Sequence, residues 1–518
     1  MEVGELEAGQ ERWLAAMKAL AGYLYEQLFQ KIEIAATLTL LEFPNLLAAL
    51  NQAQQKQSPE EVVDFATTVE QLLANLGRPT ALARVVAIRE VFTKKLGDWS
   101  KVAFEAERMK IERLLEQGQF PAALALAQTL LQKSLKAGEN AYDGADYDIA
   151  LAHDLMGDVL SKGGQAQEAL VFLEESRNRF HIMGEAGRVS AQAMASAAIT
   201  RKGDCFRNLG LFDESANAYL EAITLDKKRN AVRGIAVGKG QLGTVRMFQK
   251  KYTDALQAHQ DALKIFEQLG EPRMMATAWH QIGMVHQETD QFENAESAYR
   301  QSMEIKINEK DRAGEANSLN QLGNLYSNNG RLEEAVTFYC KAVAIFVELH
   351  DLANEGFGRS NVADKLIRLK RFAEAREELL RAIECNKPFG HSAQPWKTYS
   401  VLHNLEQAVN NPEAASKARS KARELFLAYR RDGGENHETG AKLCAMVGQA
   451  IAKKDTSETE ETIKQLATHP DLPPYLKPLL TNLQKIIASS SDKELAEDPG
   501  LYYRDAVELQ LLLESLAQ

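Results

Sequence analysis

Histidines and cysteines are the side chains of this sequence with the greatest capacity for metal binding or nucleophilic catalysis. His280 and His286 lie six residues apart, so on a helix they project from different faces and are not spaced as a zinc pair. The four cysteines form no C-x-x-C pair and are separated by tens of residues: Cys205, Cys340, Cys385 and Cys444. We interpret them as small core or surface thiols of a reducing compartment.

Known catalytic and nucleotide-binding motifs are missing from the sequence. Gly238-Lys239 lacks both the preceding glycine frame and the following Ser or Thr of a phosphate-binding loop. There is also no G-x-S-x-G elbow and no H-E-x-x-H pair. The sequence therefore predicts a protein that is not an enzyme and that needs no cofactor and no metal.

Asparagines provide the clearest candidate for molecular recognition. Asn317, Asn320, Asn324 and Asn328 are spaced by three and four residues, which places them on one stripe of a helix. Asparagine is a poor residue for a helix interior, so helix stability does not explain the stripe. Its amide both donates and accepts hydrogen bonds, which suits it to clamping a peptide backbone. The alternative interpretation is a plain solvated face.

Composition limits the classes of partner. The chain has 518 residues, a formal net charge of −11 and a sequence pI of about 5.6, which argues against nucleic acid binding. Its acidic first residues do not resemble a secretory signal. The most apolar run, Ile32 to Leu50, is interrupted by Glu33, Glu42 and Pro44 and is too broken to span a membrane. We expect a cytoplasmic protein.

The elements that position these residues repeat along the chain. Small residues recur every 40 positions, and each is followed by a large residue and then by a second small residue. The first small residues are Gly203, Gly243, Gly283, Gly323 and Ala363. We expect each unit to be a helix, a short turn and an antiparallel helix, in which the first small residue lets the second helix approach and Ala255, Ala295, Ala335 or Ala375 forms the matching notch.

The regions outside the regular repeat differ in pattern. Residues 1–104 predict irregular helical repeats, with helices from about Pro59 to Leu76, ended by Gly77, and from Pro79 to about Leu96. Residues 105–430 predict the repeat array, with regular 40-residue units over about 190–425 and a polar loop over Gly138 to Asp148. Residues 431–518 predict a C-terminal helical cap with four helices, at about 438–453, 456–468, 474–489 and 501–516.

The repeat resembles a known family. Trp279, Ile282, Gly283, Ala295 and Tyr299 follow the tetratricopeptide repeat signature, W-x₂-L-G-x₂-Y…A-x₃-F, whose usual period is about 34 residues. Six additional residues per unit should lengthen the helices and the connections. This variant is similar to the arrays of kinesin light chains, of Pins-type polarity adaptors and of the sensor regions of bacterial STAND-type NTPases. The resemblance implies an all-α fold, a right-handed α-solenoid superhelix of antiparallel helix pairs with helical caps.

The resemblance also implies that the first helix of each unit lines a concave groove. The resemblance places a partner-binding row on this helix. Counted from the first small residue of each unit, which we call the marker residue, the row occupies positions about six and three before it and one, four and five after it. Besides the four asparagines, the row contains Asp204, Arg207, Asn208, His280, Gln287, Ser360, Asp364, Arg368 and Lys397, with Phe357, Ser400 and Asn404 beside them.

The function that this groove predicts is a non-catalytic protein–protein interaction scaffold that binds a protein or peptide segment. The alternative is the ligand-sensing or regulatory arm of a larger STAND-type signalling system, whose nucleotide domain would lie outside this sequence. A homo-oligomer is also compatible with the sequence, because an imperfect cap exposes an apolar end of the array.

Overall fold

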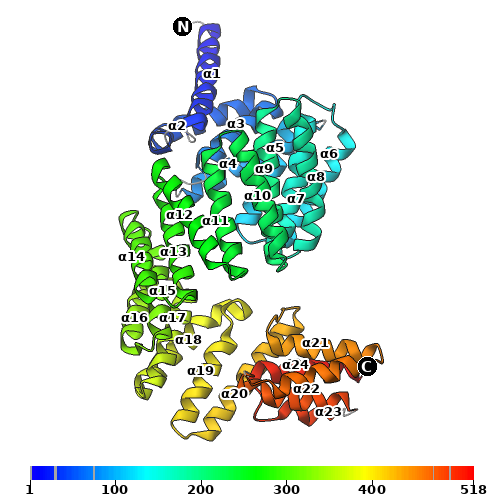
Figure 1. Cartoon of the computed structure of the whole chain (residues 1–518). Coiled ribbons are helices and arrows are strands. Elements are labelled where there is room, and N and C mark those ends of the chain that lie inside the picture. The colour runs from blue at the N-terminus through cyan, green and yellow to red at the C-terminus, as the bar shows by residue number, and fades with distance from the viewer. Residues whose placement is uncertain are drawn as a thin grey trace. The chain divides into compact units, whose positions relative to one another are not determined.

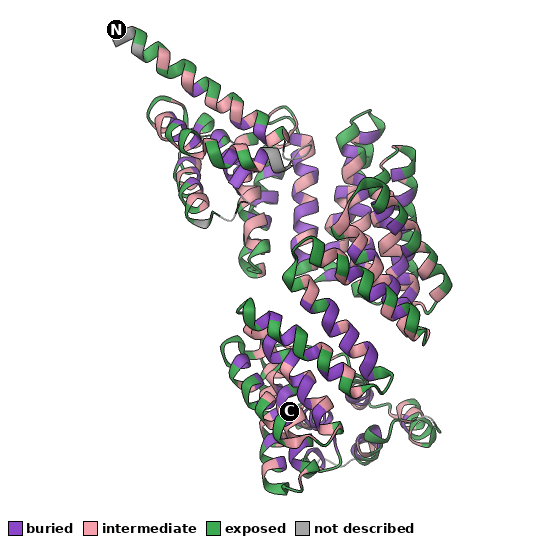
Figure 2. Cartoon of the chain, turned by 90° about the vertical axis from the view of Figure 1, so that its left-hand side faces the viewer, coloured by how far each residue is buried: buried purple, intermediate pink, exposed green. Residues whose placement is uncertain are grey.

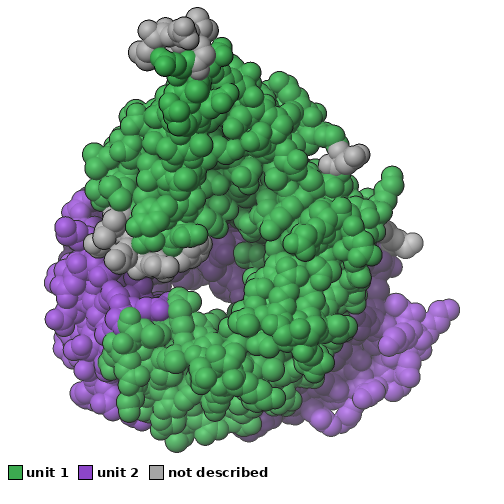
Figure 3. Space-filling view, turned by 90° about the horizontal axis from the view of Figure 1, so that it is seen from above, with its two compact units in different colours: residues 1–269 green, residues 270–518 purple. Residues whose placement is uncertain are grey.

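The computed structural model describes residues 3–27, 32–73, 76, 78–97, 99–470, 472–488 and 492–517. In this part of the chain the secondary structure is entirely helical, with 24 α-helices and three short 3-10 helices (Figure 1). Gly77, the expected helix end, lies outside the described residues. The fold class is thus all-α, as the sequence predicts. The chain divides into two compact units, residues 1–269 and 270–518, which Figure 3 shows in different colours.

Unit 1 contains twelve α-helices among its described residues, and consecutive helices pack against each other. Their bounds are α1 Val3–Gln27, α2 Ile32–Lys56, α3 Pro59–Leu73, α4 Pro79–Thr93, α5 Lys101–Glu116, α6 Phe120–Ala137, α7 Ala145–Lys162, α8 Ala166–Glu185, α9 Val189–Asn208, α10 Phe212–Lys228, α11 Val232–Phe248 and α12 Tyr252–Leu269.

Unit 2 contains the other twelve α-helices of the described chain. They are α13 Pro272–Glu288, α14 Phe292–Asn308, α15 Arg312–Asn328, α16 Leu332–Glu348, α17 Leu352–Arg368, α18 Phe372–Asn386, α19 Pro395–Ala408, α20 Pro412–Arg431, α21 Thr439–Ala452, α22 Ser457–Thr468, α23 Lys477–Ile487 and α24 Tyr503–Leu516. The 3-10 helices are η1 Lys387–Ala393, η2 Pro474–Leu476 and η3 Lys493–Glu497.

Helix boundaries follow local signals that the sequence contains. Ser58 and Glu61 form a reciprocal capping box at the start of α3, in which the Glu61 amide lies 3.3 Å from Ser58 Oγ and the Ser58 amide 3.3 Å from Glu61 Oε2. The four C-terminal helices begin and end within a few residues of their predicted positions. The predicted loop over residues 138–148 is shorter, because α7 already begins at Ala145.

A step of twenty residues underlies the 40-residue period. Seven helices, α10, α11 and α13 to α17, have 17 residues each, and three residues connect each helix to the next. One connecting residue has a left-handed conformation, at Gly210, Asn230, Lys250, Gly270, Asp290, Lys310, Gly330, His350, Lys370 and Asn410. At Gly330 the amide donates to the Ser327 carbonyl at 3.1 Å and the Arg331 amide to the Tyr326 carbonyl at 2.9 Å, a Schellman turn. The residues beyond the usual period of about 34 thus lengthen both helices of a repeat. The turn within a repeat and the turn between repeats have the same form.

Stacking of helix pairs buries one face of each helix. Figure 2 shows buried residues along the sides where helices meet and exposed residues on the outer sides. Ala295 and Ala335, both fully buried, lie at the predicted small positions of the second helices. No pair could bury these faces alone, so each relies on its neighbours.

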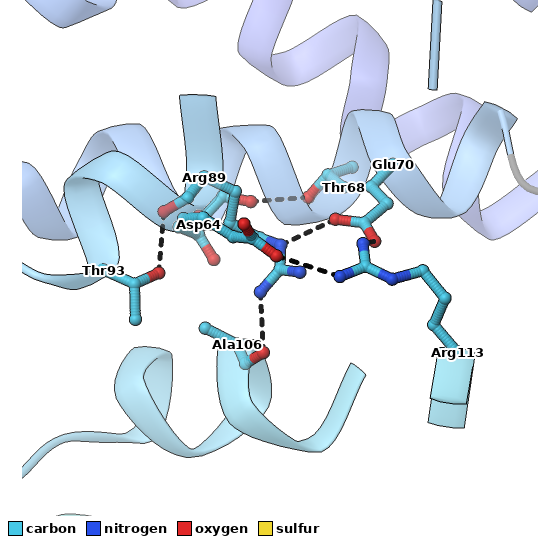
Figure 4. A network of polar contacts seen from close by, with 8 residues as sticks. Asp64, Thr68, Glu70, Arg89, Thr93, Ala106 and Arg113 are labelled. Carbon is cyan, nitrogen blue, oxygen red and sulfur yellow. Dashed lines mark hydrogen bonds and ion pairs between the residues drawn. The ribbon is translucent and has the colours of Figure 1, made fainter. Parts of the chain in front are cut away.

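A buried ion pair connects three helices of unit 1 (Figure 4). Arg89 of α4 is 1% exposed, and its Nε donates to Glu70 Oε2 of α3 at 2.6 Å. Its Nη1 donates to the Ala106 carbonyl of α5 at 2.6 Å, and Arg113 of α5 approaches Glu70 Oε1 at 3.4 Å. Because removing either partner would leave a buried charge, this network ties the irregular α3 and α4 to the first regular helices.

The C-terminal helices pack on the last repeat helix, α20, which Figure 1 shows beside α24. Trp396 and Phe426 form an apolar cluster with Tyr503 and Val507 of the C-terminal block, residues 439–517. Three arginines of α20 pair with this block, with Arg423 Nη1 2.5 Å from Glu497, Arg430 Nε 2.8 Å from Glu508 and Arg431 Nη2 3.1 Å from Glu514. The block therefore covers the end of the array with both apolar and ionic contacts.

Candidate functional site

Tyrosines of the second helices position the exposed face of the first helices. The Tyr339 ring of α16 packs on Gly323 of α15, and its hydroxyl donates to Asn324 Oδ1 at 2.7 Å. Tyr219 and Tyr299 pack in the same way on Gly203 and Gly283. Their hydroxyls donate to Asp204 at 2.7 Å and to Gln287 at 3.0 Å. Three residues of the predicted partner-binding row are therefore already held by the fold.

These pairs correct one detail of the expected packing. A β-carbon at Gly283 would meet the Tyr299 ring at 2.7 Å, so the glycine makes room for that ring and not for the small residue Ala295. The repeating tyrosine, together with the glycine sixteen residues before it, was a signal in the sequence for this contact. At the Gly243 unit the ring is that of His259.

In unit 1 the predicted row forms an internal network. Arg207 lies 3.2 Å from Asp204, and its Nη1 donates to Gln241 Oε1 of the next first helix at 2.8 Å. Burial raises the pKa of Asp204, against the opposing effect of the Tyr219 hydrogen bond. Only Asn208, among the three predicted residues of α9, is exposed. The charges of this stretch mainly satisfy one another.

On α13, His280 is a packed residue. Its ring lies 5.5 Å from the Tyr299 ring, and burial lowers its pKa to about 4, so it is neutral at neutral pH. Within the described chain its Nδ1 atom has no hydrogen-bond partner.

The asparagine stripe of α15 divides into two classes. Asn317 and Asn328 are exposed, whereas Asn324 is half-buried and bonded to Tyr339. Asn320 is 8% exposed, and its Oδ1 lacks a hydrogen-bond partner among the described residues. The two exposed amides are free to meet a partner, while the two inner ones are part of the packing.

A pocket of about 630 Å³ brings together the predicted residues of α17 and α19. Its lining includes six residues that the repeat spacing places on the groove face: Phe357, Ser360, Asp364, Lys397, Ser400 and Asn404. Arg368, one helical turn after Asp364, is exposed and does not line this pocket.

Hydrogen bonds build the floor of this pocket. Ser360 Oγ lies 2.9 Å from Thr398 Oγ1, which connects α17 to α19, and Asn386 Nδ2 donates to the same Thr398 oxygen at 3.0 Å. Asp364 accepts an ion pair from Lys365 at 2.7 Å. Lys397 makes no ion pair in the described part of the chain. The pocket therefore holds paired polar groups at its base and one available cation.

Sequence reasoning did not identify the far wall of the pocket. Tyr502 and Arg504 of the C-terminal block line it, while Asn354, Asn361 and Asn386 add further amides from α17 and α18 to the lining of the pocket. The repeat period contains no signal for Tyr502 or Arg504, because the block has no repeat.

Among the described residues, no three His, Cys, Asp or Glu side chains come together in an arrangement that could hold a metal ion. None of the described helices combines the length and apolar composition needed to cross a membrane. Cys340 is exposed and Cys205, Cys385 and Cys444 are buried, all as free thiols.

Comparisons with known proteins agree with the repeat. Profiles of the tetratricopeptide repeat match residues 274–348 and residues 196–229. No curated protein sequence gives a significant match.

Solved structures with similar folds share little sequence with the chain. BtubC (BKLC) from P. vanneervenii is 15% identical, with a TM-score of 0.39 over 45% of this chain and 92% of that one. A STAND protein with a tetratricopeptide repeat sensor from Pyrococcus horikoshii is 13% identical, with a TM-score of 0.48 over 75% of this chain and 53% of that one. The quorum sensor NprR from B. thuringiensis is 14% identical, with a TM-score of 0.44 over 71% and 99%. The chain therefore contains tetratricopeptide repeats, at residues 196–229 and 274–348, within a longer series of helix pairs.

Proposed function

We propose that this protein is a non-catalytic interaction scaffold whose repeat array binds a segment of a partner protein on the first-helix face. The observation that carries the proposal is the pocket between α17 and α19, where six residues predicted from the repeat spacing line one cavity. Amides and hydroxyls of this kind match the alternating donors and acceptors of a polypeptide backbone. Phe357, which is 54% exposed, adds an apolar contact.

The reactivity of the cysteines also favours a binding role. Burial raises the pKa of all four thiols, which disfavours the nucleophilic thiolate at neutral pH. None of the four thiols thus has the environment of an activated nucleophile.

Residues of the predicted row differ in how well they suit a binding test. Asn324→Ala would remove the hydrogen bond from Tyr339, so a loss of binding would mix a structural effect with a lost contact. Phe357 and Asn404 are both exposed and line the pocket, so their removal changes the surface with little effect on packing. The second-helix residues Leu380, which is 56% exposed, and Glu377 provide a matched control.

The experiment uses the full chain to capture partners, maps the bound segment with overlapping synthetic peptides, and measures peptide affinity by fluorescence anisotropy. We expect Phe357→Ala/Asn404→Ala to weaken the affinity at least tenfold and Leu380→Ala/Glu377→Ala to leave it unchanged. Equal affinities for both variants would contradict binding on the first-helix face. The sensing-arm alternative predicts a ligand on the same face, so a small-molecule ligand in place of a polypeptide would favour it.

A further inference from the structure

The pocket between α17 and α19 continues along α19. A second pocket, of about 220 Å³, shares Ser400, Asn404 and Tyr502 with it. A third, of about 650 Å³, shares His403, Arg419 and Pro499 with the second and reaches the turn at Asn410 and Asn411. We call this succession of pockets the α19 trough.

The two walls of the trough come from different parts of unit 2. One wall is the first-helix face of α19 with neighbouring residues of α17 and α20. The other wall belongs to the C-terminal block. Its lining residues are Tyr475, Pro499, Gly500, Tyr502 and Arg504. A site of this kind is incomplete without the block.

The wall formed by the C-terminal block is held in place before any ligand binds. Arg419 Nη2 of α20 donates to the carbonyls of Asp498 and Leu501 at 3.0 and 2.8 Å. Asn482 Nδ2 donates to Asp498 Oδ2 at 3.0 Å, which fixes the same segment from its other side. A preorganised wall loses little conformational entropy on binding, so its contacts contribute more fully to affinity.

The charge and the aromatic groups of the trough specify its ligand. Lys397 and Arg504 line the same end as Asp364. Asp364 is paired with Lys365 and Arg504 with Glu438, so Lys397 provides the charge there that has no ion-pair partner among the described residues. The two cations lie close enough that Arg504, after burial, helps to lower the pKa of Lys397. Tyr475, 54% exposed, and Tyr502 stand with ring centroids 6.5 Å apart further along the wall. An acidic side chain at the cationic end and an aromatic side chain against the tyrosines would complement both features.

We propose that an extended acidic segment of a partner protein lies in the α19 trough, clamped between the last repeat and the C-terminal block. This proposal rests on the proposed scaffold function and makes the block part of the binding site. The 14 residues of α19 rise by about 1.5 Å each. The segment in contact is therefore about six extended residues long.

The test uses peptides displayed on phage, twelve random residues long, selected against the full chain. Selected peptides are then synthesised, and their dissociation constants are measured with the wild type and with variants. Lys397→Glu reverses an exposed charge that forms no ion pair with another described residue, and Tyr475→Ala removes an exposed ring. Lys341→Glu and Leu380→Ala, on exposed second-helix positions, are the matched controls.

We expect selected peptides to be enriched in Asp or Glu together with aromatic residues. Lys397→Glu and Tyr475→Ala should each weaken their binding at least tenfold, with unchanged circular dichroism, while the controls keep wild-type affinity. Peptides that are basic, or that bind all four variants equally but lose affinity with Asn317→Ala/Asn328→Ala, would overturn the trough proposal and leave the scaffold function standing. Selection that enriches no peptide would contradict both.

Discussion

Gly323 of α15 lies directly against the ring of Tyr339 of α16, so close that a β-carbon on the glycine would be 2.6 Å from Tyr339 Cε1. The contact brings the two helices of one unit together and aims the tyrosine hydroxyl at Asn324. The same relationship recurs at Gly203 with Tyr219 and at Gly283 with Tyr299. In each of these three helix pairs, one glycine thus allows the close packing of the two helices and the position of the tyrosine hydroxyl.

Gly323→Ala should destabilise unit 2 even though alanine favours helices. Overpacking costs about 1–3 kcal/mol, and the gain in helix propensity of about 1 kcal/mol offsets only part of it. The urea midpoint followed by circular dichroism should fall. Gly240→Ala is the control, because nothing lies within 4 Å of a β-carbon there. That variant should gain stability, and a gain at Gly323 as well would contradict the contact.

Left-handed turn residues give a second prediction. Lys310 and Lys370 have φ angles of 58° and 63°. This left-handed conformation costs a residue with a β-carbon about 1–2 kcal/mol. Lys310→Gly and Lys370→Gly should therefore each stabilise the protein by about 0.5–1 kcal/mol, after the entropy of the unfolded glycine chain is subtracted. Gly330→Ala, with φ at 75°, should act in the opposite direction. Thermal unfolding can measure all three, and a loss of stability in both lysine variants would count against the turn geometry.

His259 gives a prediction about pH. It is 1% exposed, and burial lowers its pKa to about 4. In the unfolded chain its pKa is about 6.5, so between these values only the unfolded state binds the proton. The free energy of unfolding should thus fall as the pH drops from 7 to 4, by up to about 3 kcal/mol from this residue.

His259→Phe isolates this term from other titrating groups. Burial raises the pKa of Asp148 of the same unit to about 6, which has the opposite effect on the pH dependence. The quantity to measure is the difference in unfolding free energy between the wild type and His259→Phe across pH. As the pH falls toward 4, the free energy of unfolding of the wild type should decrease steadily relative to that of His259→Phe. A constant difference would mean that the pKa of His259 is the same in the folded and unfolded states.

The buried ion pair of unit 1 should respond asymmetrically to substitution. Glu70→Ala leaves the Arg89 guanidinium buried with only a carbonyl as partner and should cost about 3–5 kcal/mol of stability. Replacing both residues, as Glu70→Leu/Arg89→Met, should recover most of that loss. Arg177→Ala, which breaks the exposed pair with Glu221, should cost less than about 1 kcal/mol. Similar losses from the buried and exposed pairs would argue against the network of Figure 4.

The regular part of the fold could be predicted because its packing is periodic. The small residues at positions 203, 243, 283, 323 and 363 predicted the register of the helix pairs, and each of them lies on the first helix of a pair. The turns could not be predicted from residue types, because the left-handed position is filled by Gly, Asn, Asp, Lys or His. The left-handed position recurs with all five residue types, so the geometry of the closely spaced helix ends overrides the local preference.

The candidate site was only partly predictable. Spacing identified Ser360, Asp364 and Lys397, because these residues follow the repeat. It could not show that Arg207 and Asp204 would pair with each other or that Asn324 would be bonded to Tyr339. Nor could it identify Arg504, which reaches the pocket from a part of the chain without periodicity. Such contacts depend on tertiary packing across many residues of separation.

The uniform step of helix and turn also affects how such an array can change in length. Because the turns between α9 and α18 all place a left-handed residue at the same step, a gene that duplicated or lost a block of 40 codons within residues 210–370 would create a junction of the same backbone form as those already present. The new unit would find the same neighbours on both sides. By contrast, a duplicated C-terminal block would carry glutamates whose arginine partners lie on α20, and a second copy of the block would have no such helix to pack on. The regular repeats can therefore grow by recombination, whereas the C-terminal block cannot be copied in the same way.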